Sequence, residues 1–243
     1  MILSTSYNND IKIWNFKEGL NILTISKIFE SNNPYVFSAC IIFNENNFNI
    51  FCTGYNEYIK QYNSKGEFIK NIGNKISHRY YIDSSEIEEK KYLLVGGNKG
   101  IEVYNYPELT EYYTFIEGND SKYHNYAKII KINNTYNLID TGDFNSIKIW
   151  NFLNKSLITK INSNNTEYLG GFTIINNRYL LIGSFDKNIK EFDIEKQMMI
   201  KDINKHSGAV VGIKPVKDKN GNIFFVSYGG YGSDKNIYLW SAN

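Results

Sequence analysis

Residues 138–151 read LIDTGDFNSIKIWN, and this stretch decides the fold because its pattern recurs along the whole chain. An apolar run is followed by a short polar turn and then by an alternating run that ends at Trp150. Two strand-like runs joined by turn residues predict a β-hairpin. The pattern begins six times, at Leu3, Phe51, Leu93, Leu138, Leu180 and Phe225. Its terminal aromatics are Trp14, Tyr62, Tyr104, Trp150, Phe192 and Trp240.

The terminal aromatics recur at intervals of 42 to 48 residues. An interval of this length has room for four short strands and their turns, and repeats in this range build solenoids or propellers. Two more strand-like segments lie between consecutive hairpins, for example residues 156–161 and 167–175. No segment keeps a helical period of three to four residues. The sequence therefore predicts an all-β chain of four-stranded repeats.

Period, strand order and a hairpin ending in Trp make the chain resemble the WD-repeat β-propeller family, over essentially its whole length. The family's hairpin turn usually carries an Asp. In this chain that position holds Asp186 and Asp234 in two late repeats, and Asn8, Asn56 and Asn98 in the first three.

The family's Gly-His pair before the inner strand is nearly absent, and only the last repeat keeps the His. The resemblance therefore implies a structural hydrogen-bond network in that repeat, running from His206 through Asp234 to Trp240, with Ser227 as a further member. Asp186 is the corresponding turn residue one repeat earlier.

The resemblance implies that residues 1–243 form a single propeller domain of six four-stranded blades. The first blade has its second to fourth strands and the last blade its first to third, which predicts about 22 strands. Because the missing strands belong to different blades, the ends do not complete one another. We expect either that the chain is part of a longer polypeptide or a truncated product, or that it is a six-blade ring with a thin seam.

Charge and motifs argue against several classes of function. The net charge is only +2, so nucleic acid and anionic membranes are not expected as partners. No apolar run of about 18 residues and no signal peptide are visible, and we expect a cytoplasmic protein. No nucleophile motif, phosphate-binding loop or metal-ligand spacing is present, so we expect no catalytic residues, no cofactor and no metal. Cys40 and Cys52 are expected to be small buried side chains in a reducing compartment.

Four lysines, at positions 12, 60, 148 and 190, fall at the same point of the alternating strand. They are either a ring that binds phosphate or part of a solvated strand face. We favour the solvated face, because Lys is common there in the family pattern.

Recurring aromatics are the candidate binding residues. One set stands where the inner strand begins, at Tyr35, Tyr80, Tyr126 and Tyr168. A second set precedes the hairpin turn, at Tyr7, Tyr55 and Phe185. In the family these positions open on one end of the propeller, the face that most often takes peptides, and Tyr gives large contact area at low entropy cost. The alternative is that these rings only wedge the blade tops together.

We therefore expect a non-catalytic scaffold that binds a protein or peptide partner through one end face. A second interpretation is a structural or oligomerising module of a larger cytoskeletal or ciliary assembly, using open blade edges and the loops at 84–91 and 117–122. A third is the regulatory domain of a longer multidomain enzyme.

Overall fold

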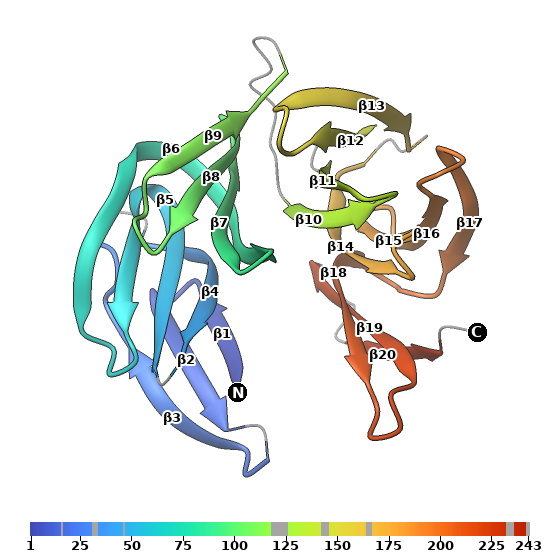
Figure 1. The fold of residues 1–243 in the computed structure, drawn as a ribbon. Helices are drawn as coiled ribbons and strands as arrows, with labels where there is room; N and C mark the ends of the chain where they lie inside the picture. The colour runs from blue at the N-terminus through green and yellow to red at the C-terminus, as the bar shows by residue number, and fades with distance from the viewer. Residues whose placement is uncertain are drawn as a thin grey trace. The chain divides into compact units, whose positions relative to one another are not determined.

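The computed structural model describes residues 1–15, 17–30, 34–45, 47–117, 126–141, 146–163, 167–231 and 236–241. These residues form 20 strands and no helix, so this part of the chain has no helix fit to cross a membrane. Strands that follow one another in sequence lie next to one another in the sheets, as antiparallel meanders (Figure 1). Meanders of this kind are the blades of propellers. The expected all-β propeller fold class is confirmed.

Asparagines supply many of the turns. Asn133 and Asn134 both have positive φ, and so do Asn176 and Asn177. Two successive residues with positive φ make the type I′ turn, whose twist matches that of a hairpin, and Asn adopts this conformation readily. The Asn-rich composition thus explains how short strands can follow one another closely.

Contacts divide the chain into two compact units, Met1–Lys128 and Ile129–Asn243. The first unit contains a three-stranded sheet of β1 (Ile2–Ser6), β2 (Asp10–Asn15) and β3 (Leu20–Ile25). It also contains a six-stranded sheet of β4 (Val36–Asn44), β5 (Asn47–Asn63), β6 (Phe68–Ile87), β7 (Lys90–Gly97), β8 (Gly100–Tyr106) and β9 (Glu111–Phe115).

The six-stranded sheet consists of two meanders. β5 and β6 are long strands, and each has two parts, here called arms, that pair with different neighbours. Sγ of Cys52 lies 3.9 Å from the carbonyl oxygen of Lys60, whereas eight residues of straight strand would separate them by about 26 Å. β5 therefore turns back on itself near Asn56, which has a φ of 59°. The first arm of β6 pairs with β5 and its second arm, from Arg79, pairs with β7. The described residues thus form 20 strands in five hydrogen-bonded sheets. Because β5 and β6 each have two arms and the six-stranded sheet holds two meanders, this is roughly consistent with the expected six blades and about 22 strands.

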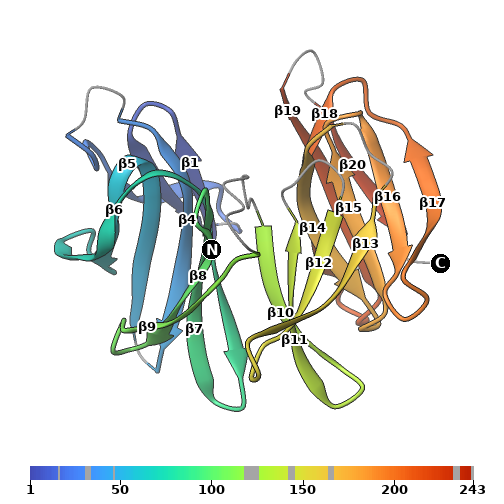
Figure 2. The ribbon, with the colours of Figure 1, turned by 90° about the horizontal axis from the view of Figure 1, so that it is seen from above.

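The boundary between the units falls within β10, and the strands from β10 onward form three sheets. The first has β10 (Tyr126–Ile132), β11 (Thr135–Thr141), β12 (Ser146–Asn151) and β13 (Ser156–Asn162). The second has β14 (Leu169–Ile175), β15 (Tyr179–Ser184), β16 (Asn188–Asp193) and β17 (Met198–Asn204), side by side in chain order in Figures 1 and 2. The last has β18 (Ala209–Lys217), β19 (Ile223–Tyr231) and β20 (Ile237–Ser241).

The core lies between successive meanders, as expected for repeats that cannot bury their faces alone. One cluster joins β2 to β4 and β5 and includes Ile11, Ile13 and Cys52. A second joins the two meanders of the six-stranded sheet and includes Cys40 and Phe51. Both cysteines are buried, and neither forms a disulfide. Cys40 pairs with Phe51, one position from Cys52, so the two thiols point to opposite faces of the sheet and enter different clusters.

One of the two expected surface loops is a tight turn. Residues 84–91 are not a long loop, because β6 runs to Ile87 and β7 begins at Lys90. Glu88 and Glu89 between them have φ values of 46° and 67°, which close a two-residue turn. In the other expected loop, residues 118–122 lie outside the described part of the chain.

The solvated-face interpretation is wrong for two of the four aligned lysines. The side chains of Lys148 and Lys190 are buried. Nζ of Lys190 lies 3.0 Å from a carboxylate oxygen of Asp186 and 3.1 Å from one of Asp202. Lys60 donates a hydrogen bond to the carbonyl of Ile28 at 2.7 Å. Buried cations require partners, and the two carboxylates provide them for Lys190.

Candidate functional site

Aromatic rings of the first unit form a continuous row. The ring of Tyr7 lies 5.0 Å from that of Tyr35 and 6.4 Å from that of Phe37, measured between centroids. Phe37 lies 5.2 Å from Tyr80. His78 then stacks on Tyr80 at 5.3 Å and meets Tyr55 edge-on at 4.8 Å. We call these six residues the aromatic row: Tyr35, Tyr7, Phe37, Tyr80, His78 and Tyr55.

The topology explains why the row forms. Tyr7 follows the end of β1, and Tyr35 and Phe37 stand at the beginning of β4. Tyr55 lies where β5 turns, and its register partner is His78. Strand residues two positions apart share a face, so Tyr35 shares its face with Phe37 and His78 with Tyr80. The row therefore gathers aromatics from one end of three neighbouring meanders.

The row is accessible at one end and half-buried at the other. The side chain of Tyr7 is 58% exposed and that of Tyr35 is 38% exposed, while Phe37, Tyr55, His78 and Tyr80 have intermediate burial. Contiguous exposed aromatics are unusual on a monomer and mark interaction surfaces. The row can therefore bury apolar groups of a ligand and offer its phenol hydroxyls to polar ones.

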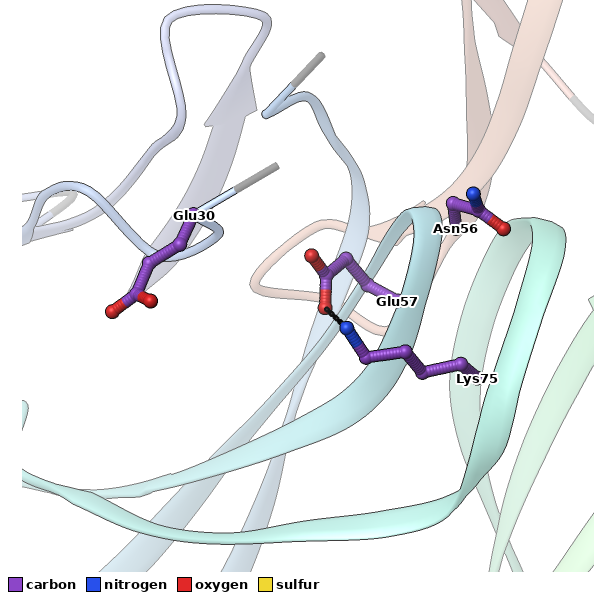
Figure 3. A pocket seen from close by; sticks show the side chains of 4 residues that line it. All are labelled: Glu30, Asn56, Glu57 and Lys75. Atoms are coloured by element: carbon purple, nitrogen blue, oxygen red, sulfur yellow. Dashed lines mark ion pairs between the residues drawn. The ribbon is translucent and has the colours of Figure 1, made fainter. Parts of the chain in front are cut away.

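The same unit has a hollow of about 420 Å³, lined by Glu30, Asn56, Glu57 and Lys75. Asn56 follows Tyr55 directly, so one turn of β5 serves both features. Figure 3 shows the Glu57 carboxylate and the Lys75 ammonium pointing toward one another, whereas the Asn56 amide points away. Nζ of Lys75 lies 3.9 Å from Oε2 of Glu57. The lining carries two carboxylates and one ammonium group.

Arg79 supports the row and the hollow from the opposite side of the strand. It lies between His78 and Tyr80 in β6 and is fully buried. Its Nε donates to Oε2 of Glu102 at 2.7 Å and its Nη2 to Oε1 at 3.0 Å. Its Nη1 donates to the carbonyl of Glu57 at 3.0 Å and to that of Asn74 at 2.7 Å. One guanidinium thus connects β8 with the backbone of the residue that lines the hollow.

Tyr104 completes this buried group by donating its hydroxyl to Oε1 of Glu102 at 3.1 Å. Burial, and after it the negative charge of Glu102, raise the pKa of Tyr104 above its usual value. The hydroxyl therefore stays protonated and remains a donor at neutral pH.

The remaining predicted aromatics lie outside the row. The ring of Tyr126 lies 4.9 Å from that of Tyr81. In the second unit, the ring of Tyr168 lies 6.0 Å from that of Phe185, whose backbone N–H donates to the Tyr168 carbonyl at 3.0 Å. Of the seven predicted residues, the structure brings four together in the row.

Sequence reasoning missed Phe37 and His78, which join the predicted tyrosines into one row. The available signal was that Phe37 lies two positions from Tyr35 and His78 two positions from Tyr80, a spacing that favours the same face of a strand. It also missed Glu30, Glu57 and Lys75, for which no local pattern exists.

Three residues of the structural network expected in the last repeat, His206, Ser227 and Trp240, contact one another. Nε2 of His206 lies 2.7 Å from Oγ of Ser227, and Nε1 of Trp240 donates to the same oxygen at 2.8 Å. His206 and Ser227 are buried. Asp234 lies outside the described residues. Asp186 accepts a hydrogen bond from the backbone of Asn188 at 3.0 Å, which closes its own turn.

In the first repeat the buried turn residue is Asn9, one position after the expected Asn8. Oδ1 of Asn9 accepts from the N–H of Phe29 at 2.9 Å, and its Nδ2 donates to the Phe29 carbonyl at 2.7 Å. Asn8 is exposed. Asn9 therefore ties the hairpin to the segment that leads into β4.

No known family model matches this chain. A comparison with curated protein sequences likewise gives no match. Within the described residues, no group of three or more His, Cys, Asp or Glu side chains is arranged to hold a metal ion.

Proposed function

We propose that the chain is a WD-repeat propeller module that binds a protein or peptide through the aromatic row and carries out no catalysis itself. The observation that carries the proposal is the continuity of the row with its exposed members, Tyr7 and Tyr35. Tyr is enriched among the residues that dominate binding energy, because its ring buries much area while fixing few torsions. A rigid strand scaffold holds these rings in place before a partner arrives, which lowers the entropic cost of binding.

WD-repeat identity is part of the proposal and is supported by the hairpins that end in Trp or another aromatic. The His206, Ser227 and Trp240 contacts support it further. We also propose a cytoplasmic location, because neither of the two buried cysteines forms a disulfide. The small net charge makes a protein or peptide a better partner than nucleic acid or a membrane surface.

A displayed library of random 12-residue peptides, selected on the intact chain, tests this proposal. The enriched peptides should lose at least tenfold in affinity for the Tyr7→Ala/Tyr35→Ala variant. Tyr113→Ala is the matched control, because Tyr113 is also 38% exposed in the same unit and lies outside the row. If enriched peptides bind the double variant as tightly as the parent chain while its melting temperature is unchanged, the aromatic row is not the binding surface.

A second function, association through an open strand edge, is favoured by β20. Ile237 and Leu239 are 72% and 66% exposed, whereas Ile11 and Ile13, at the corresponding points of the first hairpin, are buried. Within the described residues β20 pairs only with β19. Unpaired apolar edges promote association. Sedimentation of the parent chain should then show oligomers that Ile237→Lys removes, and a monomeric parent chain would contradict this function.

A further inference from the structure

The carboxylate of Glu57 has an unusual environment in the hollow. Its side chain is only 8% exposed, yet no hydrogen bond from the described residues reaches the carboxylate. The nearest cation, Nζ of Lys75 at 3.9 Å, is beyond hydrogen-bonding distance and belongs to a side chain that is 58% exposed. An ion pair with so exposed a partner contributes little, because water screens it and the long side chain must be held still. Buried carboxylates normally accept hydrogen bonds.

Glu102 shows how the same chain satisfies a carboxylate of similar burial. The Glu102 side chain is 10% exposed, and both of its oxygens accept from the guanidinium of Arg79. Planar guanidinium groups fit carboxylates in this two-bond geometry, and such charge-assisted bonds are about twice as strong as neutral ones. Glu57 has the charge and the burial of Glu102 without the donor.

The hollow can admit such a donor from outside. Its volume of about 420 Å³ suits a side chain, and Glu30 adds a second negative charge to its lining. Tyr55 of the aromatic row precedes Asn56 of the hollow in the same turn, so the two features share one turn of β5. The stems of Arg and Lys pack well on aromatic rings, and their cationic ends are attracted to ring faces.

We propose that the hollow is the specificity pocket of the binding surface and takes an arginine side chain of the partner, with Glu57 as its main acceptor and Glu30 as a second negative charge. This inference rests on the proposed function, in which the aromatic row holds the rest of the bound segment. Lys75 moves into solvent when the guanidinium enters. Lysine binds less tightly than arginine, because an ammonium group cannot make the two parallel bonds.

The test uses two small probes, N-acetyl-arginine amide and the uncharged N-acetyl-citrulline amide, titrated into the intact chain. The ring signals of His78 report binding by nuclear magnetic resonance. The arginine probe should bind at least fivefold more tightly than the citrulline probe. Glu57→Gln should abolish that difference, and Lys75→Gln should increase it, because a competing cation is removed. Glu45→Gln is the matched control, an exposed carboxylate in the turn between β4 and β5.

Equal affinity for the two probes, or a difference that survives Glu57→Gln in a folded variant, would overturn the inference. Those results leave the proposed function standing if Tyr7→Ala/Tyr35→Ala still weakens the library peptides. Conversely, if the Tyr7→Ala/Tyr35→Ala variant binds those peptides normally, the proposed function fails. The probe titration then still shows whether the hollow prefers arginine. The library adds a second readout, since enriched peptides should contain arginine and lose this enrichment on Glu57→Gln.

Discussion

Replacing Glu102 by Gln is the sharpest test of how the site is held in place. The substitution keeps the shape of the side chain and removes its charge. It leaves the fully buried guanidinium of Arg79 without a counter-charge. Because Arg79 also holds the carbonyl of Glu57, the change reaches the hollow.

The magnitude follows from the contacts. Two charge-assisted hydrogen bonds join Arg79 to Glu102, at 2.7 and 3.0 Å, and each contributes about 1.5–3 kcal/mol. Gln keeps one acceptor oxygen but turns an amide donor toward the guanidinium. Removing one member of a buried ion pair typically costs about 3–5 kcal/mol. Since both side chains are almost fully buried, screening by water reduces this little. We expect the free energy of unfolding to fall by about 3–4 kcal/mol.

Urea denaturation followed by tryptophan fluorescence measures the effect, with Arg79→Met, Glu102→Leu and the double variant completing a cycle. The double variant buries no charge and loses only the partners of two carbonyls and the Tyr104 hydroxyl. It should therefore be more stable than the sum of the single losses predicts, by at least about 2 kcal/mol. A loss below about 1 kcal/mol for Glu102→Gln, or additive single losses, would refute the reasoning.

Three further predictions concern packing and burial. Ser227→Ala removes the buried oxygen that the side chains of His206 and Trp240 share, and it should lower the free energy of unfolding by about 1–3 kcal/mol in urea titrations. Ser4→Ala is the control, because it removes an exposed acceptor at the same point of the first repeat, and it should cost under about 1 kcal/mol. Gly54→Ala places a methyl group 2.6 Å from the carbonyl oxygen of Tyr35, so it should lower the free energy of unfolding by about 1–3 kcal/mol and weaken peptide binding at the row. A variant with the melting temperature and peptide affinity of the parent chain would contradict this contact. Burial raises the pKa of Cys52 from 9.0 to about 12, so the unfolded chain loses this proton near pH 9 while the folded chain keeps it. Stability should then fall above pH 9 by up to about 1.4 kcal/mol per pH unit, and an equally steep fall in Cys52→Ala would show that other groups cause it.

The hairpins could be predicted from the sequence because they depend on near neighbours. Alternation with a period of two marks a strand, and turn residues such as Asn133 and Asn176 adopt positive φ almost regardless of distant contacts. The six repeats, the strands after Trp150 and the burial of both cysteines follow from such local rules. The sequence did not predict that β5 and β6 would each run on as one long strand with two arms. This depends on whether the backbone stays hydrogen-bonded as it passes from one pairing partner to the next.

The candidate site was predictable only in part. Tyr7, Tyr35, Tyr55 and Tyr80 stand at recurring positions, and the resemblance to the WD-repeat family implied that these positions lie at one end of the meanders. This resemblance assigns these aromatics to an end, but it says nothing of ring-to-ring distances.

Chain order and residue type alone determined the strands, the turns and the recurring positions of the tyrosines, because these depend on interactions between residues close in sequence. The tertiary structure alone decided that Phe37 and His78 close the row, that Arg79 is neutralised by Glu102, and that Glu57 is buried without such a partner. Apart from the stacking of His78 on Tyr80, these contacts join residues that lie 18 to 43 positions apart in the sequence. Whether a charged side chain is buried, and whether it has a partner of opposite charge, depends on which distant segments the fold packs against it. A local sequence pattern does not contain this information.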